Sequence, residues 1–110
     1  MKMKQYTSKE QTAKLIELGF PKPKSVINEH KVLESNPYAP IEFEYTYSIG
    51  ELIEFIPRWI KLRGGLEIVA ESDGWLVMHG HDPFDPQCTK TELIDALYEY
   101  CVTLKEEGVI

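Results

Sequence analysis

The chain has 110 residues, 43% of them hydrophobic and 27% charged, with a formal net charge of −6, which fits one globular domain over residues 1–110 and excludes a wholly disordered chain. The acidic charge disfavours general nucleic-acid binding, because an acidic surface repels phosphate backbones, and two cysteines are too few for a disulfide scaffold. No apolar run is long enough for a membrane span or a secretory leader, so we expect a cytoplasmic protein that does not associate with membranes.

The first predicted element is a short helix. Thr7 and Glu10 have the spacing of a capping box, in which each side chain bonds the backbone amide of the other residue. Gly19 and Pro21 then end the helix, because glycine adopts the left-handed conformation after a helix and proline cannot continue one. Residues 20–40 contain four prolines and no clear periodicity. The sequence leaves open whether they form a short strand or an irregular segment.

The next two elements have clear patterns. Apolar and polar residues alternate over residues 41–47, which predicts a strand with one buried and one wet face. Ser48 and Glu51 form a second capping box, and apolar residues at helical spacing follow it. Proline is not tolerated inside a helix, so we expect the helix to end just before Pro57.

A hairpin is predicted over residues 66–80, because two apolar runs flank Asp73-Gly74, a dipeptide typical of type I′ turns. With these two residues as the loop, Ile68 lies opposite His79, and the large apolar residues of both strands share one face. A loop that is one residue longer would change this register.

The last predicted element is a helix with a third capping box, Thr89 to Glu92, followed by apolar residues at positions i, i+3, i+4 and i+7 and a stop at Gly108. The elements together predict an α+β domain. In it, three helices pack on one face of a small antiparallel sheet of three or four strands, including the hairpin at about 66–80.

The stretch VMHGHDPFDP, residues 77–86, raises the question of a metal site. His79 and His81 are two apart at a predicted strand end, so both imidazoles can reach one ion, and Asp82 and Asp85 can add carboxylates. This pattern fits a divalent metal such as zinc. The sequence favours a simpler interpretation with no cofactor, a strand end followed by Asp-Pro turns, because two histidines alone do not complete a tetrahedral site.

Cys88 adds a thiol-based alternative. It lies near the predicted N-terminus of the last helix, where the helix dipole favours a thiolate, and either neighbouring histidine would serve as its base. No residue that would orient such a pair is identifiable in the sequence. Cys101 lies in the apolar stripe of the same helix, so we expect it to be a buried hydrophobic residue.

Trp59 and Arg58 are candidates for a protein-interaction site. They follow the helix-ending Pro57, and tryptophan and arginine are both common at the energetic centres of protein interfaces. The alternative is that Trp59 closes one end of the core, and the usual burial of tryptophan favours that alternative.

Four motifs spread over most of the chain form a familiar combination. They are Thr7-x-x-Glu10-Gln11 with Gly19-x-Pro21, Tyr47-Ser48-Ile49-Gly50-Glu51, Trp75-x-Val77 and Leu93-Ile94-x-Ala96-Leu97. Together they resemble small uncharacterised α+β proteins of gut bacteria and their prophages or mobile elements. The resemblance implies a phage-linked accessory role and identifies no catalytic residue, because those proteins have no established activity.

The sequence therefore favours a non-enzymatic protein-interaction module, or an accessory protein of a phage or mobile element. Such a module would bind a protein partner or associate with itself. The alternative function is a metal-dependent or thiol-based enzyme centred on the strand end that carries His79 and His81. The sequence does not identify a substrate or a partner.

Overall fold

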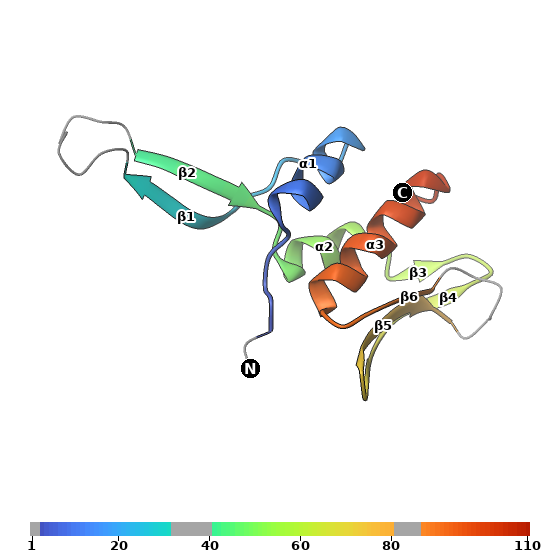
Figure 1. Cartoon of the computed structure of the whole chain (residues 1–110). Coiled ribbons are helices and arrows are strands. Elements are labelled where there is room, and N and C mark those ends of the chain that lie inside the picture. Colours follow the sequence, from blue (N-terminus) through green and yellow to red (C-terminus); the bar gives the residue numbers. More distant parts are fainter. Residues whose placement is uncertain (1–2, 32–40, 81–86) are drawn as a thin grey trace.

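The computed structural model describes residues 3–31, 41–80 and 87–110, and Figure 1 shows how their helices and strands are arranged. In chain order the elements are α1 (Lys9–Glu17), β1 (Ser25–Lys31), β2 (Ile41–Thr46), α2 (Ile49–Phe55), β3 (Trp59–Ile60), β4 (Gly64–Glu71), β5 (Gly74–His79), β6 (Gln87–Lys90) and α3 (Leu93–Glu106). The described residues thus form an α+β fold with three helices and two antiparallel sheets. The predicted fold class is confirmed, and β4 and β5 form the predicted hairpin.

Two sheets take the place of the single sheet that the sequence predicts. A four-stranded antiparallel sheet has the order β3, β4, β5 and β6, and a two-stranded sheet consists of β1 and β2. The strand predicted over residues 41–47 exists, but it pairs with β1 in an arm that projects away from the helices (Figure 1). In the main body, α3 packs directly on β5 and β6, and α2 packs on α3. The helices therefore lie on one face of the four-stranded sheet.

The register of the hairpin differs from the predicted one by two residues. Glu71 pairs with Gly74, so the loop is Ser72-Asp73 instead of Asp73-Gly74. A side chain at Gly74 would overlap the carbonyl oxygen of Lys90 on the neighbouring strand, so the glycine is needed inside the sheet and not in the loop. Because the shift is two residues, every side chain keeps its predicted face.

Two of the predicted helix starts hold closely. The α2 box is confirmed: the Ser48 side chain accepts from the Glu51 amide, and the Glu51 carboxylate accepts from the Ser48 amide. In α1 the box is formed by Ser8 and Gln11, one residue later than predicted. The reason is that the hydroxyl of Thr7 takes part in a different, buried set of hydrogen bonds.

The third predicted capping box is wrong. Residues 87–90 pair with β5 as the edge strand β6, and α3 begins only at Leu93. Glu92 is the residue at the N-cap, and its side chain makes no capping hydrogen bond. Cross-strand pairing of Thr89 with Leu76 therefore prevails over the local capping pattern.

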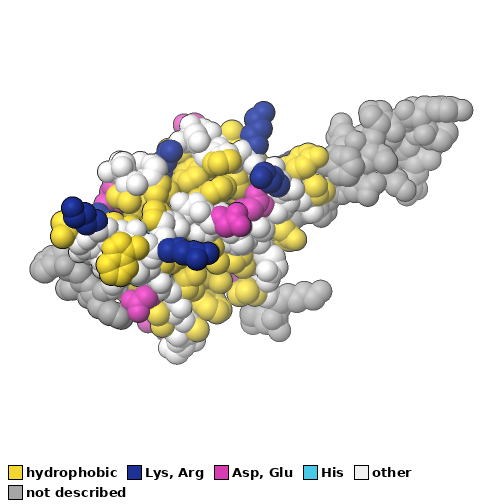
Figure 2. Space-filling model, turned by 180° about the vertical axis from the view of Figure 1, so that it is seen from behind, with side chains coloured by type: hydrophobic (Ala, Val, Ile, Leu, Met, Phe, Trp, Pro, Cys, Tyr) yellow, Lys and Arg dark blue, Asp and Glu magenta, His cyan; other side chains and the backbone are white. Residues whose placement is uncertain are grey.

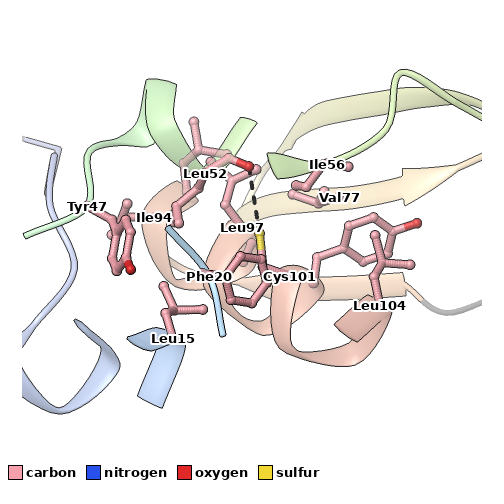
Figure 3. Packing of buried hydrophobic residues seen from close by; sticks show 13 residues of the cluster. Leu15, Phe20, Tyr47, Leu52, Ile56, Val77, Ile94, Leu97, Cys101 and Leu104 are labelled. Carbon is pink, nitrogen blue, oxygen red and sulfur yellow. Dashed lines mark hydrogen bonds between the residues drawn. The ribbon is translucent and has the colours of Figure 1, made fainter. Parts of the chain in front are cut away.

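One cluster of buried apolar side chains joins the three helices to β5 (Figure 3). Cys101 lies in it, as predicted, and its thiol donates to the carbonyl oxygen of Leu52 at 3.7 Å. The cluster consists of Leu15, Phe20, Tyr47, Leu52, Ile56, Val77, Leu93, Ile94, Ala96, Leu97, Tyr100, Cys101 and Leu104. About half of these residues belong to α3, so this helix is the centre of the core.

Three buried threonines join the N-terminal segment, α1 and the end of β2. The hydroxyl oxygens of Thr7, Thr12 and Thr46 lie 2.7, 2.8 and 3.1 Å from one another. The Thr12 hydroxyl donates to the Ser8 carbonyl at 2.7 Å, and the Thr46 hydroxyl donates to the Thr7 carbonyl at 2.6 Å. The remaining proton, on Thr7, is then available for one of the other two hydroxyls. All three groups are satisfied by the protein itself, as burial requires.

Replacing Thr46 by Val keeps the shape of the side chain and removes its hydroxyl. We expect the free energy of unfolding to fall by about 1–3 kcal/mol, because the buried Thr7 carbonyl loses its donor. Chemical denaturation of the variant and wild type measures this change. The matched control is Thr89→Val on the exposed edge strand, which should change stability by less than about 0.5 kcal/mol. Equal effects of the two substitutions would contradict the role of the threonine cluster.

The β1–β2 arm makes the molecule more extended in space than a compact domain with the same number of residues. The radius of gyration is 16.6 Å, compared with roughly 13 Å expected for a compact domain of this length. An isolated two-stranded ribbon is only marginally stable in water, so the base of the arm needs firm attachment.

Glu51, in the first turn of α2, provides this attachment. Its carboxylate accepts hydrogen bonds from the Ser25 hydroxyl, from the Lys24 amide at 3.1 Å and from the Ser48 amide at 3.2 Å. Partial burial alone would raise the pKa of Glu51, but these hydrogen bonds outweigh it and hold the pKa below its ordinary value of 4.5. The charged carboxylate therefore ties the start of β1 to α2.

Replacing Glu51 by Gln removes the charge and should lower the free energy of unfolding at pH 7. Because the pKa in the folded state is lowered, the stability that the charge contributes is complete above the unfolded pKa. It is lost as the pH falls through the folded pKa, so the difference between wild type and variant should shrink below about pH 4. Urea unfolding at a series of pH values measures the difference.

Glu54→Gln is the matched control, because Glu54 is exposed on the same helix. It should show little change at any pH. A wild-type advantage over Glu51→Gln that stays constant or grows toward acid pH would contradict the anchoring role of this carboxylate.

Candidate functional site

His79 ends β5 and is almost completely buried, with 1% of its surface exposed. Its Nε2 lies 2.6 Å from the carbonyl oxygen of Pro57, and its Nδ1 lies 2.5 Å from the hydroxyl of Tyr100 on α3. A carbonyl oxygen only accepts, so Nε2 carries the proton and donates it to Pro57. In the neutral ring Nδ1 is then the acceptor, and the Tyr100 hydroxyl donates to it.

Both ring nitrogens of His79 are engaged by protein groups, whereas a metal ligand needs one of them for the ion, so the role of His79 as a metal ligand stays a prediction. The other predicted ligands, His81, Asp82 and Asp85, lie outside the described residues. Among the residues that the structure describes, no three histidine, cysteine, aspartate or glutamate side chains come close enough to hold a metal ion. The structure therefore gives a zinc site no support from His79.

The two thiols are also placed unfavourably for nucleophilic chemistry. Cys88 lies in β6, opposite Val77, and not at the N-terminus of a helix as predicted. Burial is the main reason that its pKa is raised, and the nearby carboxylate of Glu99 adds to the effect. Burial also raises the pKa of Cys101, to about 12. Both cysteines thus remain thiols at neutral pH, and a thiol is a poor nucleophile.

The predicted interaction residues Trp59 and Arg58 lie where the chain enters β3, and both are exposed. Trp59 has 71% of its surface exposed, so the alternative that it closes the core is wrong. The local reason is the hydrogen bond from His79 to Pro57, which holds the preceding residue at the end of β5. Arg58 and Trp59, which follow Pro57, are exposed, and Ile60 after them packs against the core.

Leu62, which the sequence analysis did not single out, is the most exposed large apolar residue of the same region, at 95%. It lies in the turn between β3 and β4 and has a φ angle of 70°, a left-handed conformation that only glycine adopts without cost. The turn packs closely against Gly80, where a side chain would overlap the Arg63 carbonyl. A leucine between two basic residues before a Gly-Gly pair was the available sequence signal.

Trp59 and part of β4 lie on the face of the sheet that points away from α3, which we call the outer face. Trp59 pairs with Gly65, so its side chain has the same direction as those of Glu67, Val69 and Glu71. The described helices lie on the other face (Figure 1). Val69 is 38% exposed on this face, and Glu67 lies between it and the position opposite Trp59.

An apolar hollow of about 400 Å³ lies at the base of the arm. It is open to solvent and is lined by Ile16, Lys22, Pro23 and Tyr45. Tyr45 is 51% exposed although the alternating pattern predicts a buried position. The threonine cluster explains this difference, because it turns Thr46 inward. The residues that line the hollow offer apolar contact and one amine, with no acid, base or nucleophile pair.

Charged side chains are distributed without a continuous basic surface on the face that Figure 2 shows. Lysine, arginine, aspartate and glutamate are scattered among apolar side chains there. One ion pair joins Arg63 to Glu107 at 3.0 Å, and another joins Lys4 to Asp95 at 3.3 Å. This scattered pattern differs from the clustered lysines and arginines of nucleic-acid-binding surfaces.

The chain matches no family model, no curated protein and no solved structure. The resemblance to small proteins of gut bacteria and their prophages therefore stays a prediction. Within the part of the chain that the structure describes, none of the helices has the length and apolar character needed to cross a membrane.

Replacing Tyr100 by Phe tests the buried bridge at His79. The variant lacks the hydroxyl that donates to Nδ1, so we expect the free energy of unfolding to fall by about 1–3 kcal/mol. Tyr98→Phe on the same helix is the control, because Tyr98 is only half-buried, and its effect should stay within about 0.5 kcal/mol. Thermal and urea unfolding measure both. A Tyr100→Phe variant as stable as wild type would contradict the bridge.

Proposed function

We propose that the chain is a cytoplasmic, non-enzymatic module that binds another protein through the outer face of its four-stranded sheet and the β3–β4 turn. The observation that carries this proposal is the exposure of Trp59 and Leu62, at 71% and 95%, three residues apart in β3 and the turn that follows it. Tryptophan and arginine are enriched at the energetic centres of interfaces, and Arg58 is exposed beside them.

The backbone of Leu62 supports the same proposal. A non-glycine residue in the left-handed region costs about 1–2 kcal/mol, and a fully exposed leucine returns none of this through burial. Folding alone gives no reason for leucine at this position. Contact with a partner gives one, because the side chain becomes buried in the complex.

The interior supports the non-enzymatic part of the proposal. His79, the histidine that the structure describes at the predicted enzyme site, bonds with both ring nitrogens to protein groups. Burial raises the pKa of both thiols. The chemistry-bearing side chains at this site therefore hold the fold together, whereas the exposed apolar residues are free for recognition.

Replacing Trp59 by Ser tests the proposal through binding. Wild type, Trp59→Ser and Leu62→Ser are used as baits, and a protein that wild type retains is then purified and titrated against each. We expect the dissociation constant to rise at least about tenfold for Trp59→Ser, the loss typical of a central interface residue. Leu62→Ser should weaken binding as well, without lowering stability.

The matched control is Ile16→Ser, because Ile16 is exposed to 45% on α1, where it lines the hollow at the base of the arm. It should leave binding unchanged. Partners that tolerate Trp59→Ser but are lost with Ile16→Ser would place the interaction at the hollow below the arm and would contradict the proposal. The proposal would also be contradicted if wild type retained no protein that the Trp59→Ser variant fails to retain.

A further inference from the structure

The edge of the four-stranded sheet beside Trp59 is open over most of its length. β4 has eight residues, but β3 has two and pairs only with Gly64 and Gly65. On its other side β4 pairs with β5 along residues 66–71. Among the described residues, no strand lies beside residues 67–71 on the side of β4 where β3 pairs with Gly64 and Gly65. We call this unoccupied position next to β4 the open lane. Val69 and Ala70 are exposed there, in agreement with an open edge.

The backbone hydrogen bonds at the start of β4 fix which of its backbone groups point toward this open edge. The amide of Leu66 donates to the Arg58 carbonyl on the β3 side, whereas the carbonyl of Gly65 accepts from Gly80 on the β5 side. In an antiparallel strand these directions alternate from residue to residue. The amides and carbonyls of Ile68 and Ala70 therefore point toward the open lane, in the same direction as the Leu66 amide that bonds to the β3 side. Such an edge is a template for one more strand.

We propose that the partner adds an extended segment to β4 as a further antiparallel strand, in the lane that β3 leaves, and that this segment carries basic residues next to an apolar one. The inference rests on the proposed function, because it names how the partner binds at the same site. Addition of a strand to a sheet edge is a recurring mode of peptide recognition, in which backbone bonds give affinity and flanking side chains give specificity.

The side chains along the edge determine the chemistry of this segment. Val69 is the apolar neighbour on the outer face, Glu71 follows it on the same face, and Asp73 lies in the adjoining loop. Glu71 and Asp73 are both exposed. A residue directly across from an acid is favourable when it is basic. The best complement therefore has an apolar residue opposite Val69 and lysine or arginine opposite the two acids.

A second copy of the chain is a poor occupant of the same edge. Antiparallel self-pairing centred on Val69 would place Glu67 of each copy opposite Glu71 of the other. Pairing centred on Ala70 would place Glu67 opposite Asp73 in the same reciprocal way. Like charges directly opposite each other are destabilising, and each chain has a net charge of −6. In these two registers the acids oppose self-association, whereas a basic partner meets them favourably.

The probe for this proposal is the synthetic peptide KTKTVTT, which places valine opposite Val69 and its two lysines opposite Glu71 and Asp73. Its matched control is ETETVTT. In an NMR titration of the full chain we expect shifts centred on residues 68–71 and slower amide exchange at Ile68 and Ala70. The acidic peptide should bind at least about tenfold more weakly. Equal binding of the two peptides, or shifts that leave residues 68–71 unaffected, would overturn the proposal.

Ala70→Pro tests the backbone directly. Its amide points into the lane, so proline removes a donor for the added strand and leaves the β4–β5 ladder intact, as at other sheet edges. We expect this variant to lose binding of KTKTVTT. A folded Ala70→Pro protein that binds the peptide like wild type would overturn the proposal.

Glu71→Lys serves as a second variant that does not depend on the fold tolerating proline. It should weaken the binding of KTKTVTT about fivefold or more and strengthen the binding of ETETVTT.

Failure of this proposal is distinguishable from failure of the proposed function. If strand addition is wrong, a partner still depends on Trp59 but tolerates Ala70→Pro and Glu71→Lys. If the proposed function is wrong, no partner depends on Trp59.

Discussion

One buried imidazole determines how the main parts of the domain fit together. His79 ends the central strand β5, and its two nitrogens bond to α3 through Tyr100 and to the segment after α2 through Pro57. The bond to Tyr100 is buried and the bond to Pro57 is partly buried, so loss of either partner would leave a polar group of the buried imidazole unsatisfied. The position of Pro57 then decides where β3 begins. Because the chain before it enters the core at Ile56, β3 covers only the first residues of β4 and leaves the rest of that edge open.

Several side chains depart from the usual burial of apolar groups and exposure of polar ones. Among the described residues, buried polar side chains join separate segments through hydrogen bonds. They are Thr7, Thr12, Thr46 and His79. Large apolar residues, Trp59 and Leu62 above all, lie on the surface. A buried polar group that is fully satisfied contributes a unique geometry, whereas an exposed apolar group contributes little to folding. The surface residues are thus the ones that need a reason outside the fold.

Much of the fold follows from local sequence patterns. The α2 capping box, the alternation over residues 41–47 and the apolar stripe of α3 correctly predict an α+β domain with a hairpin. Local patterns do not determine which distant segments pair with one another. The strand at 41–47 pairs with β1 and not with the hairpin, and residues 87–90 form an edge strand because β5 offers them a partner. The position of Gly74 likewise depends on Lys90, which follows it by sixteen residues.

The candidate site could be predicted only in part, for the same physical reason. The sequence identifies Trp59 and Arg58 as residues suited to recognition, but their exposure is a property of the folded chain, in which the preceding Pro57 bonds to His79 more than twenty residues away. His79 itself has the spacing of a metal ligand, and only the approach of Tyr100 and Pro57 shows that its nitrogens are used. The open edge of β4 depends on the length of β3, which no local pattern specifies.

The most direct test is to measure which ring nitrogen of His79 carries the proton and whether zinc changes the nitrogen chemical shifts. Long-range nitrogen–proton NMR correlations at neutral pH distinguish the two neutral forms of the ring. The account predicts a proton on Nε2, none on Nδ1, and unchanged nitrogen shifts when zinc is added in excess. A proton on Nδ1 with none on Nε2 would contradict the bonds to Pro57 and Tyr100, and a zinc-dependent shift of either nitrogen would show that the imidazole is available to ligands. Either result would contradict its role as the internal bridge.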